Sequence, residues 1–306
     1  MSDLDPELAA VVDDIQSAGV PAWHRLSVER ARRVEDDVFA DDDPREVAFV
    51  RNLAFDGPRG AVPVRVYHDD PPRPAPVVVF YHGGGWTLGT LDSIDGPCRE
   101  LATRADAVVV SVDYRLAPEH PHPAAIDDCV AAYRDLTGRV DPSMTVIAGD
   151  SAGGGATLAT LTTLRDSGDP LPACAYLLSP WTDLTMSGDT IVSKADVDPM
   201  IPTDLISSAA EMYAGDQPLD DPRVSPLFAD LSGLPPVLIQ TGVDEVLLAD
   251  STRLADRLTA AGVYNELDLA EGMWHVYPMF TGVMPEAGAA LAHAARFIRA
   301  RTRVDH

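Results

Sequence analysis

The run Gly149-Asp150-Ser151-Ala152-Gly153-Gly154 constrains the fold of this chain more than any other feature. An apolar stretch typical of a short buried strand, residues 144–148, leads into the run, and a helix-compatible stretch begins at Gly153. A serine between glycines at such a strand-to-helix turn adopts a strained backbone that pushes its hydroxyl out above the sheet. Glycine–serine runs also form ordinary turns, so Ser151 is a candidate nucleophile that needs support from the rest of the chain.

A second glycine run, His82-Gly83-Gly84-Gly85-Trp86, supplies that support. It follows residues 77–81, a β-branched and aromatic stretch that predicts a buried strand. The glycines therefore lie at the carboxyl end of a strand, where open α/β sheets bind ligands. Their N–H groups, together with that of Ala152, are suited to hold the oxyanion of a tetrahedral intermediate. A phosphate loop is disfavoured because no Lys-Ser or Lys-Thr pair follows the glycines.

With these motifs the chain resembles the hormone-sensitive-lipase-like carboxylesterases of the α/β-hydrolase fold. Four matching stretches occur in the order of that family, within roughly residues 45–300. They are Tyr81-His82-Gly83-Gly84-Gly85-Trp86, Asp113-Tyr114-Arg115-Leu116-Ala117-Pro118-Glu119, Gly149-Asp150-Ser151-Ala152-Gly153-Gly154 and Gly272-Met273-Trp274-His275. The resemblance implies an ester hydrolase that works through a Ser-acid-His triad.

The acid and the base are expected downstream of the serine, in the order of the α/β hydrolases. Residues 237–242 predict a buried strand, and Asp244 follows on the loop at its carboxyl end. Residues 265–270 predict a further strand, and His275 follows on the next loop. Parallel strands would bring Ser151, Asp244 and His275 to one edge of the sheet, so we predict these three as the catalytic residues.

Each of these assignments has an alternative. Asp244 is also placed to cap the helix that follows it. Glu245 and Asp250 are the competing acids, and Glu245 would point away if Asp244 points inward. Among eight histidines, His275 is the one that fits the Gly-x-x-His pattern of the family resembled. By the same resemblance, His82 is a residue that fixes the glycine loop.

The alternation of apolar strands with helical patterns predicts an α/β fold with a mainly parallel, doubly wound sheet. Residues 46–184 and 228–306 would form the catalytic domain. Residues 1–45 precede the first strand-like run, and the insertion 185–227 interrupts the sheet pattern. In the family resembled, these two segments pack together as a helical cap over the site. From the residues alone, they could equally be ordinary surface helices.

Four residues are expected to contact substrate, namely Trp86, Asp150, Met200 and Tyr213. Further candidates in the cap segments are Trp23, Ile201, Leu205 and Met212. Apolar residues on helices are more often simply part of the core, and this reading stays open for all of them. The cap would shape the acyl and alcohol pockets, so the sequence does not reveal the length of the acyl chain or the identity of the alcohol.

The charge of the chain is strongly negative, with 48 acidic and 23 basic residues and a formal net charge of −25. A nucleic-acid or anionic-membrane partner is therefore disfavoured. Thirty-seven of the acids are Asp, and Lys194 is the single lysine. This composition is typical of a halophilic protein, which stays soluble in concentrated salt. The alternative is an arginine-rich protein from a GC-rich genome.

Cysteine usage and targeting signals give mostly negative evidence. Cys98, Cys129 and Cys174 are odd in number and widely spaced, so we expect core thiols and neither a disulfide framework nor a zinc site. The start of the chain lacks a basic segment followed by an apolar core, and no stretch of ~18 apolar residues occurs. We therefore expect a soluble, cytoplasmic protein.

Residues 113–123 form a proline-rich elbow after the predicted strand 107–112. The Ala117–Pro118 and His122–Pro123 bonds are the natural candidates for cis peptides. In the family resembled, this elbow supports the floor of the active site, so we expect a structural role.

The sequence thus predicts a serine carboxylesterase acting on esters with short to medium acyl chains, with no metal or organic cofactor. A lactone, an acetylated small molecule or an amide could be cleaved by the same triad. A ligand-binding relative without catalysis is a second class, and the intact Ser151, Asp244 and His275 argue against it. The expected partner is a small-molecule ester, and homo-oligomer formation is left open.

Overall fold

The computed structural model describes residues 26–39, 44–71 and 73–302. Eight strands form one sheet in the order β1-β2-β4-β3-β5-β6-β7-β8. β1 and β2 form an antiparallel hairpin, β2 pairs antiparallel with β4, and the strands from β4 to β8 in that order are parallel. The strands are β1 Phe49–Gly57, β2 Gly60–His68, β3 Val77–Tyr81, β4 Val108–Val112, β5 Thr145–Asp150, β6 Cys174–Leu178, β7 Val237–Gly242 and β8 Asn265–Ala270. The predicted mainly parallel α/β sheet is confirmed.

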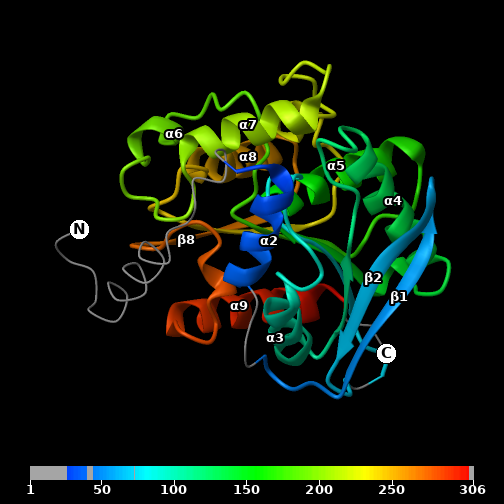
Figure 1. The fold of residues 1–306 in the computed structure, drawn as a ribbon. Coiled ribbons are helices and arrows are strands. Elements are labelled where there is room, and N and C mark those ends of the chain that lie inside the picture. The colour runs from blue at the N-terminus through cyan, green and yellow to red at the C-terminus, as the bar shows by residue number, and fades with distance from the viewer. Residues whose placement is uncertain (1–25, 40–43, 72, 303–306) are drawn as a thin grey trace.

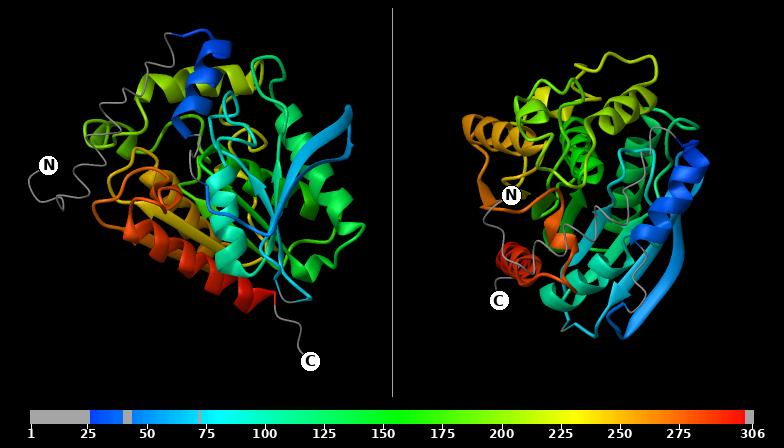
Figure 2. Two further views of the ribbon diagram at one scale, coloured as in Figure 1. Left: turned by 60° about the horizontal axis from the view of Figure 1, so that its bottom comes forward. Right: turned by 60° about the vertical axis from the view of Figure 1, so that its left-hand side comes forward.

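Helices cover both faces of this sheet (Figures 1 and 2). α3 (Asp95–Ala105) and α9 (Pro285–Arg301) pack on one face through an apolar cluster that includes Val78, Val109, Val146 and Leu238. The other face is covered by α4 (Ala124–Thr137), α5 (Ala152–Ser167) and α8 (Leu248–Ala260). Within the described residues, short 3-10 helices lie at η2 Pro142–Met144, η3 Pro226–Phe228 and η4 Tyr277–Met279.

The segments expected to form a cap contain three described helices, α2 (Val28–Phe39), α6 (Thr190–Ser193) and α7 (Thr203–Ala214). Ala31 of α2 belongs to a small apolar cluster with Leu88, and Leu205 of α7 packs against the same cluster. The first segment and the insertion thus meet beside the loop that follows β3. Residues 1–25, with the expected lid residue Trp23, lie outside the described residues.

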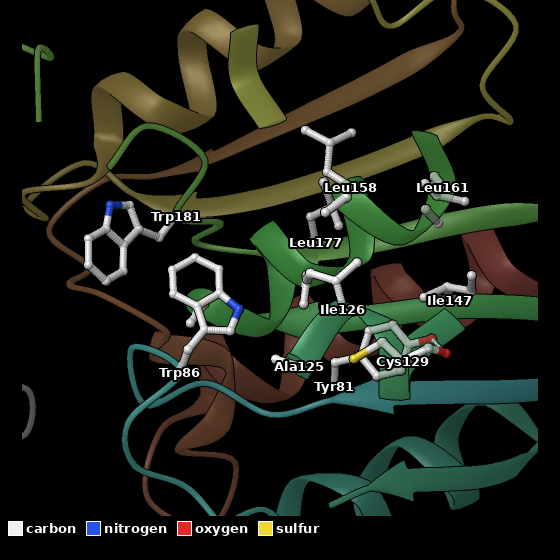
Figure 3. Packing of buried hydrophobic residues seen from close by; sticks show 14 of the residues in the cluster. Tyr81, Trp86, Ala125, Ile126, Cys129, Ile147, Leu158, Leu161, Leu177 and Trp181 are labelled. Carbon is white, nitrogen blue, oxygen red and sulfur yellow. Dashed lines mark hydrogen bonds between the residues drawn. The ribbon is translucent and has the colours of Figure 1, made fainter. Parts of the chain in front are cut away.

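The main core lies between the sheet and the helices α4, α5 and α8. Tyr81, at the end of β3, donates a hydrogen bond of 2.8 Å to the carbonyl of Cys129 on α4. Figure 3 shows this pair, together with Trp86 and Trp181 side by side at the end of the same core. Cys98, Cys129 and Cys174 are buried free thiols, as predicted.

Candidate active site

Ser151 occupies the sharp turn between β5 and α5, with φ 50° and ψ −119°. The turn is tight because the backbones of neighbouring segments approach closely: a Cβ on Gly149 would lie 2.3 Å from the Gly153 carbonyl oxygen, and one on Gly153 would lie 1.9 Å from that of Tyr81. Only glycine fits at both positions. The sequence-based interpretation of this run as a strained strand-to-helix turn is therefore confirmed.

The glycine loop follows β3 and lies beside this turn. Gly84 and Gly85 have φ values of 92° and 62°, which favour glycine. Gly83 differs from the other two, because it lies directly against the Asp150 carboxylate. A Cβ on Gly83 would lie only 2.2 Å from Oδ2 of Asp150. A side chain at this position would therefore displace Asp150, and the role of the three glycines as oxyanion donors stays a prediction.

His82 and the proline-rich elbow hold the glycine loop from behind. His82 is buried, its Nδ1 lies 2.9 Å from the Gly83 carbonyl oxygen, and its ring stacks on Tyr114 at 4.2 Å. The Tyr114 hydroxyl donates a 2.6 Å hydrogen bond to the carbonyl of His82. Burial lowers the pKa of His82 to about 4, so this ring is neutral near pH 7. The Ala117–Pro118 and His122–Pro123 bonds are cis, as predicted.

The acid beside the histidine is Glu245, and the prediction of Asp244 for this position is wrong. Nδ1 of His275 lies 3.4 Å from Oε1 of Glu245, whose side chain is 0% exposed. Asp244 points the other way: its side chain is 37% exposed and its Oδ1 lies 2.9 Å from Nζ of Lys194. Consecutive residues on this turn face opposite sides, and the longer Glu side chain reaches the imidazole.

Two further donors hold the Glu245 carboxylate. Oε2 accepts hydrogen bonds from the Ser179 hydroxyl at 2.6 Å and from the Gly242 N–H at 3.0 Å. The same Ser179 oxygen accepts the N–H of Val276, next to His275, at 3.0 Å. Ser179 follows β6 and was not foreseen from the sequence, although its place at a strand end offered a signal. Ends of β3, β5, β6, β7 and β8 thus converge on one edge of the sheet.

The charges around His275 make its imidazole a good proton acceptor. Burial by itself would lower the pKa of His275, but the hydrogen bond that its imidazole makes to Glu245 and the charges of Glu245, Asp198 and Asp150 outweigh burial and raise the pKa above 6.5. Because a carboxylate only accepts hydrogen bonds, Nδ1 carries the proton toward Glu245 and Nε2 keeps its lone pair. Nε2 is therefore the atom that can take a proton from a nucleophile.

The other competing acid, Asp250, has a structural role. Its Oδ2 accepts the N–H groups of Thr182 at 2.7 Å and Asp183 at 2.8 Å, which fixes the segment after β6. Burial raises the pKa of this carboxyl to about 7.

The four residues expected to contact substrate are distributed differently. Trp86 stacks on Tyr213 with 4.2 Å between ring centroids, and both side chains are buried in the core. Met200 is half-buried against the apolar cluster around Trp274. Asp150 is buried behind the glycine loop, and burial raises the pKa of its carboxyl to about 7. The expectation that these four residues contact substrate stays a prediction.

Among the described residues, no group of three or more His, Cys, Asp or Glu side chains is arranged to hold a metal ion. In the same part of the chain, no helix is both long and apolar enough to cross a membrane.

Comparisons with known proteins agree with this geometry. A family model described as the alpha/beta hydrolase fold matches residues 78–279. The carboxylesterase NlhH of Mycobacterium tuberculosis is 39% identical over 94% of this chain and 93% of its own length. An acetyl-hydrolase of Streptomyces hygroscopicus is 36% identical over 85% of this chain and 90% of its own length. The crystal structure of an esterase from the bacterial hormone-sensitive lipase family matches with a TM-score of 0.89 at 36% identity, covering 98% of this chain and 100% of that chain. The chain belongs to the hormone-sensitive-lipase-like carboxylesterase family of the α/β-hydrolase fold.

Proposed function

We propose that this protein is a serine carboxylesterase that cleaves esters with short to medium acyl chains through an acyl-enzyme. One observation carries the proposal: a serine on a strained strand-to-helix turn shares a sheet edge with a histidine whose Nδ1 faces a fully buried glutamate. The names of the relatives, carboxylesterase and acetyl-hydrolase, support the same reaction class.

In the proposed mechanism, Ser151 attacks the ester carbonyl while Nε2 of His275 takes the hydroxyl proton. Glu245 fixes the imidazole tautomer and stabilises the imidazolium. The N–H groups of Ala152 and of the glycine run, Gly83, Gly84 and Gly85, bind the oxyanion. His275 then protonates the leaving alcohol, and a water activated by the same histidine releases the acid. Every step uses side chains and backbone of this chain, without a metal or an organic cofactor.

The segments 1–45 and 185–227 are proposed to form a cap that sets the substrate range. The contact of α2 and α7 around Leu88 supports this division, since Leu88 belongs to the loop that continues from the oxyanion glycines. The aromatic stack of Trp86 on Tyr213 links the insertion to the same loop. Met200 is the residue we propose to line the acyl pocket.

A substrate series tests the proposed reaction. We expect hydrolysis of p-nitrophenyl esters with the highest kcat/KM between acetate and octanoate, and a fall for longer acyl chains. Assays with a γ-lactone and with p-nitroacetanilide, run under the same conditions, test the alternative substrates. A kcat/KM for the lactone or the amide above that for every ester would replace the proposed reaction.

The pH profile of hydrolysis provides a second test. His275 must be neutral to accept a proton, and the facing carboxylates raise its pKa above 6.5. We expect kcat/KM to rise with pH through an apparent pKa above 6.5, so that activity is lost on the acidic side of this value. Initial rates with p-nitrophenyl butyrate at constant ionic strength would show this limb. A limb centred near pH 5 would mean that the imidazole lacks the facing charges described above.

The acidic composition supports a halophilic environment, a proposal independent of the reaction. With 37 Asp and one Lys, repulsion between surface carboxylates destabilises the fold in dilute buffer, whereas the Debye length falls to ~3 Å at 1 M salt. Salts that are excluded from the surface also strengthen apolar burial. We expect Tm and activity to rise from dilute buffer to molar KCl. A flat or falling Tm would leave the acidity as an effect of genome composition.

The net charge also bears on which molecules this protein binds. The net charge of −25 supports a small neutral ester as substrate and disfavours nucleic acid. The cytoplasmic location and the oligomeric state stay predictions.

A further inference from the structure

A stretch of the insertion, residues 190–201, runs along the loop that carries Glu245. Three of its side chains, spaced four residues apart, contact that loop. The N–H of Lys194 donates to the carbonyl of Thr190 at 2.9 Å, and that of Asp198 donates to the carbonyl of Lys194 at 3.0 Å. Consecutive helical turns thus place Thr190, Lys194 and Asp198 on one side of the stretch.

The contacts fall on residues directly around the catalytic acid. The Thr190 hydroxyl donates to the carbonyl of Val246 at 2.8 Å and accepts the N–H of Ala249 at 2.9 Å. Nζ of Lys194 binds Asp244 at 2.9 Å. Oδ2 of Asp198 accepts the N–H of Val246 at 2.9 Å. The insertion therefore fixes the residues on either side of Glu245.

Asp198 is the best-placed member of this set. Its side chain is buried, and its second oxygen, Oδ1, accepts the N–H groups of Met200 at 2.9 Å and Ile201 at 3.3 Å. Three backbone donors thus hold the carboxylate in one orientation. Because Met200 packs against the apolar cluster that contains Trp274, the residue before His275, the same carboxylate links this part of the insertion to the acid loop.

Asp198 also adds a charge beside the catalytic histidine. Burial and, to a smaller extent, the charge of Glu245 raise the pKa of Asp198 to about 6, against the opposing effects of His275 and of the backbone donors Val246 and Met200. The charges that face His275 come from three elements: Glu245 after β7, Asp198 from the insertion and Asp150 at the end of β5. Near pH 7 an ionised Asp198 therefore favours the imidazolium.

We propose that Asp198 is a positioning residue for the reaction: it holds the backbone of the loop that carries Glu245, and its charge stabilises the imidazolium of His275. The insertion is then part of the catalytic machinery as well as a wall of the substrate pocket. This inference rests on the esterase function proposed above.

Two measurements on Asp198→Asn test it, with Asp196→Asn as the matched control because this exposed neighbour loses the same charge. The first is a ¹H NMR titration of the His275 imidazole, which needs no turnover. We expect Asp198→Asn to lower the pKa of His275 by about half a unit or more. The second is turnover of p-nitrophenyl butyrate, where we expect kcat to fall by about tenfold or more, with KM changed by less than about twofold.

The control variant should match the wild-type enzyme in both measurements. An Asp198→Asn protein with the same His275 pKa and the same kcat as Asp196→Asn would overturn the inference. A wild-type protein that hydrolyses no ester would instead overturn the proposed function, while the NMR titration would still decide the role of Asp198.

A second variant separates position from charge and serves if Asp198→Asn does not fold. Thr190→Val keeps the side-chain shape but removes both hydrogen bonds to Val246 and Ala249. We expect kcat to fall about threefold or more while the pKa of His275 stays unchanged. A kcat equal to that of the wild type would show that contacts from this stretch do not position the acid loop.

Discussion

Replacement of Ser151 by alanine is expected to lower kcat for p-nitrophenyl butyrate by on the order of 10⁴-fold or more. The hydroxyl is the only group lost, and in the proposed mechanism its oxygen forms the covalent bond to the acyl group. The residual rate would come from the oxyanion donors and from substrate binding. The residue is only 8% exposed, and although Ser151 is the N-cap of α5, its side chain makes no cap hydrogen bond, so the fold should be retained.

The measurement compares steady-state rates of the two proteins after a thermal melt has shown that both are folded. The matched control is Ser167→Ala, which makes the same chemical change at the far end of α5, away from the site. Thr182→Ala is unsuitable as a control, because it would disturb the contacts of Asp250. Retention of a tenth of the wild-type activity in Ser151→Ala would remove Ser151 from the role of nucleophile.

Glu245→Gln is expected to lower kcat by on the order of 10⁴-fold, because a neutral amide no longer fixes the Nδ1–H tautomer of His275 or stabilises its imidazolium. Asp244→Asn removes a carboxylate from the adjacent residue and serves as the matched control. Its side chain faces Lys194 at the surface, so we expect a loss of less than about tenfold.

Rates of the two variants at saturating substrate, measured side by side, decide between the acids. A severe loss in Asp244→Asn together with a mild loss in Glu245→Gln would restore the assignment that the sequence suggested. The pH profile adds a second criterion, since loss of the Glu245 charge should also lower the apparent pKa of His275.

Much of the sheet could be predicted because its inner strands are apolar on both faces. The expected bounds of β3, β7 and β8 match the structure, since each is a short apolar or alternating run bounded by turn residues. β2 was not foreseen. Pro63 lies inside it, and Arg65 interrupts its apolar pattern, both of which disfavour a strand. Its pairing partners in β1 and β4, rather than its own residues, define this strand.

The acid could not be chosen from local sequence. Asp244 and Glu245 follow the same strand, and either type of carboxylate suits the role. The choice depends on partners that are distant in the chain: Lys194 draws Asp244 outward, while Ser179 holds Glu245 toward His275. For a similar reason, the burial of Trp86 could not be predicted, because Tyr213 and Trp181 come from remote segments to pack against it.

The central claim, that Ser151 is the nucleophile of an acyl transfer activated by His275, is tested most directly by covalent trapping. A p-nitrophenyl alkylphosphonate transfers its phosphonyl group to an activated serine and releases p-nitrophenol, and the adduct resists hydrolysis. We predict one equivalent of p-nitrophenol per protein chain and, by peptide mass spectrometry, a phosphonyl group on Ser151 alone. A protein that remains unmodified while it hydrolyses p-nitrophenyl butyrate, or an adduct on another residue, would contradict this account.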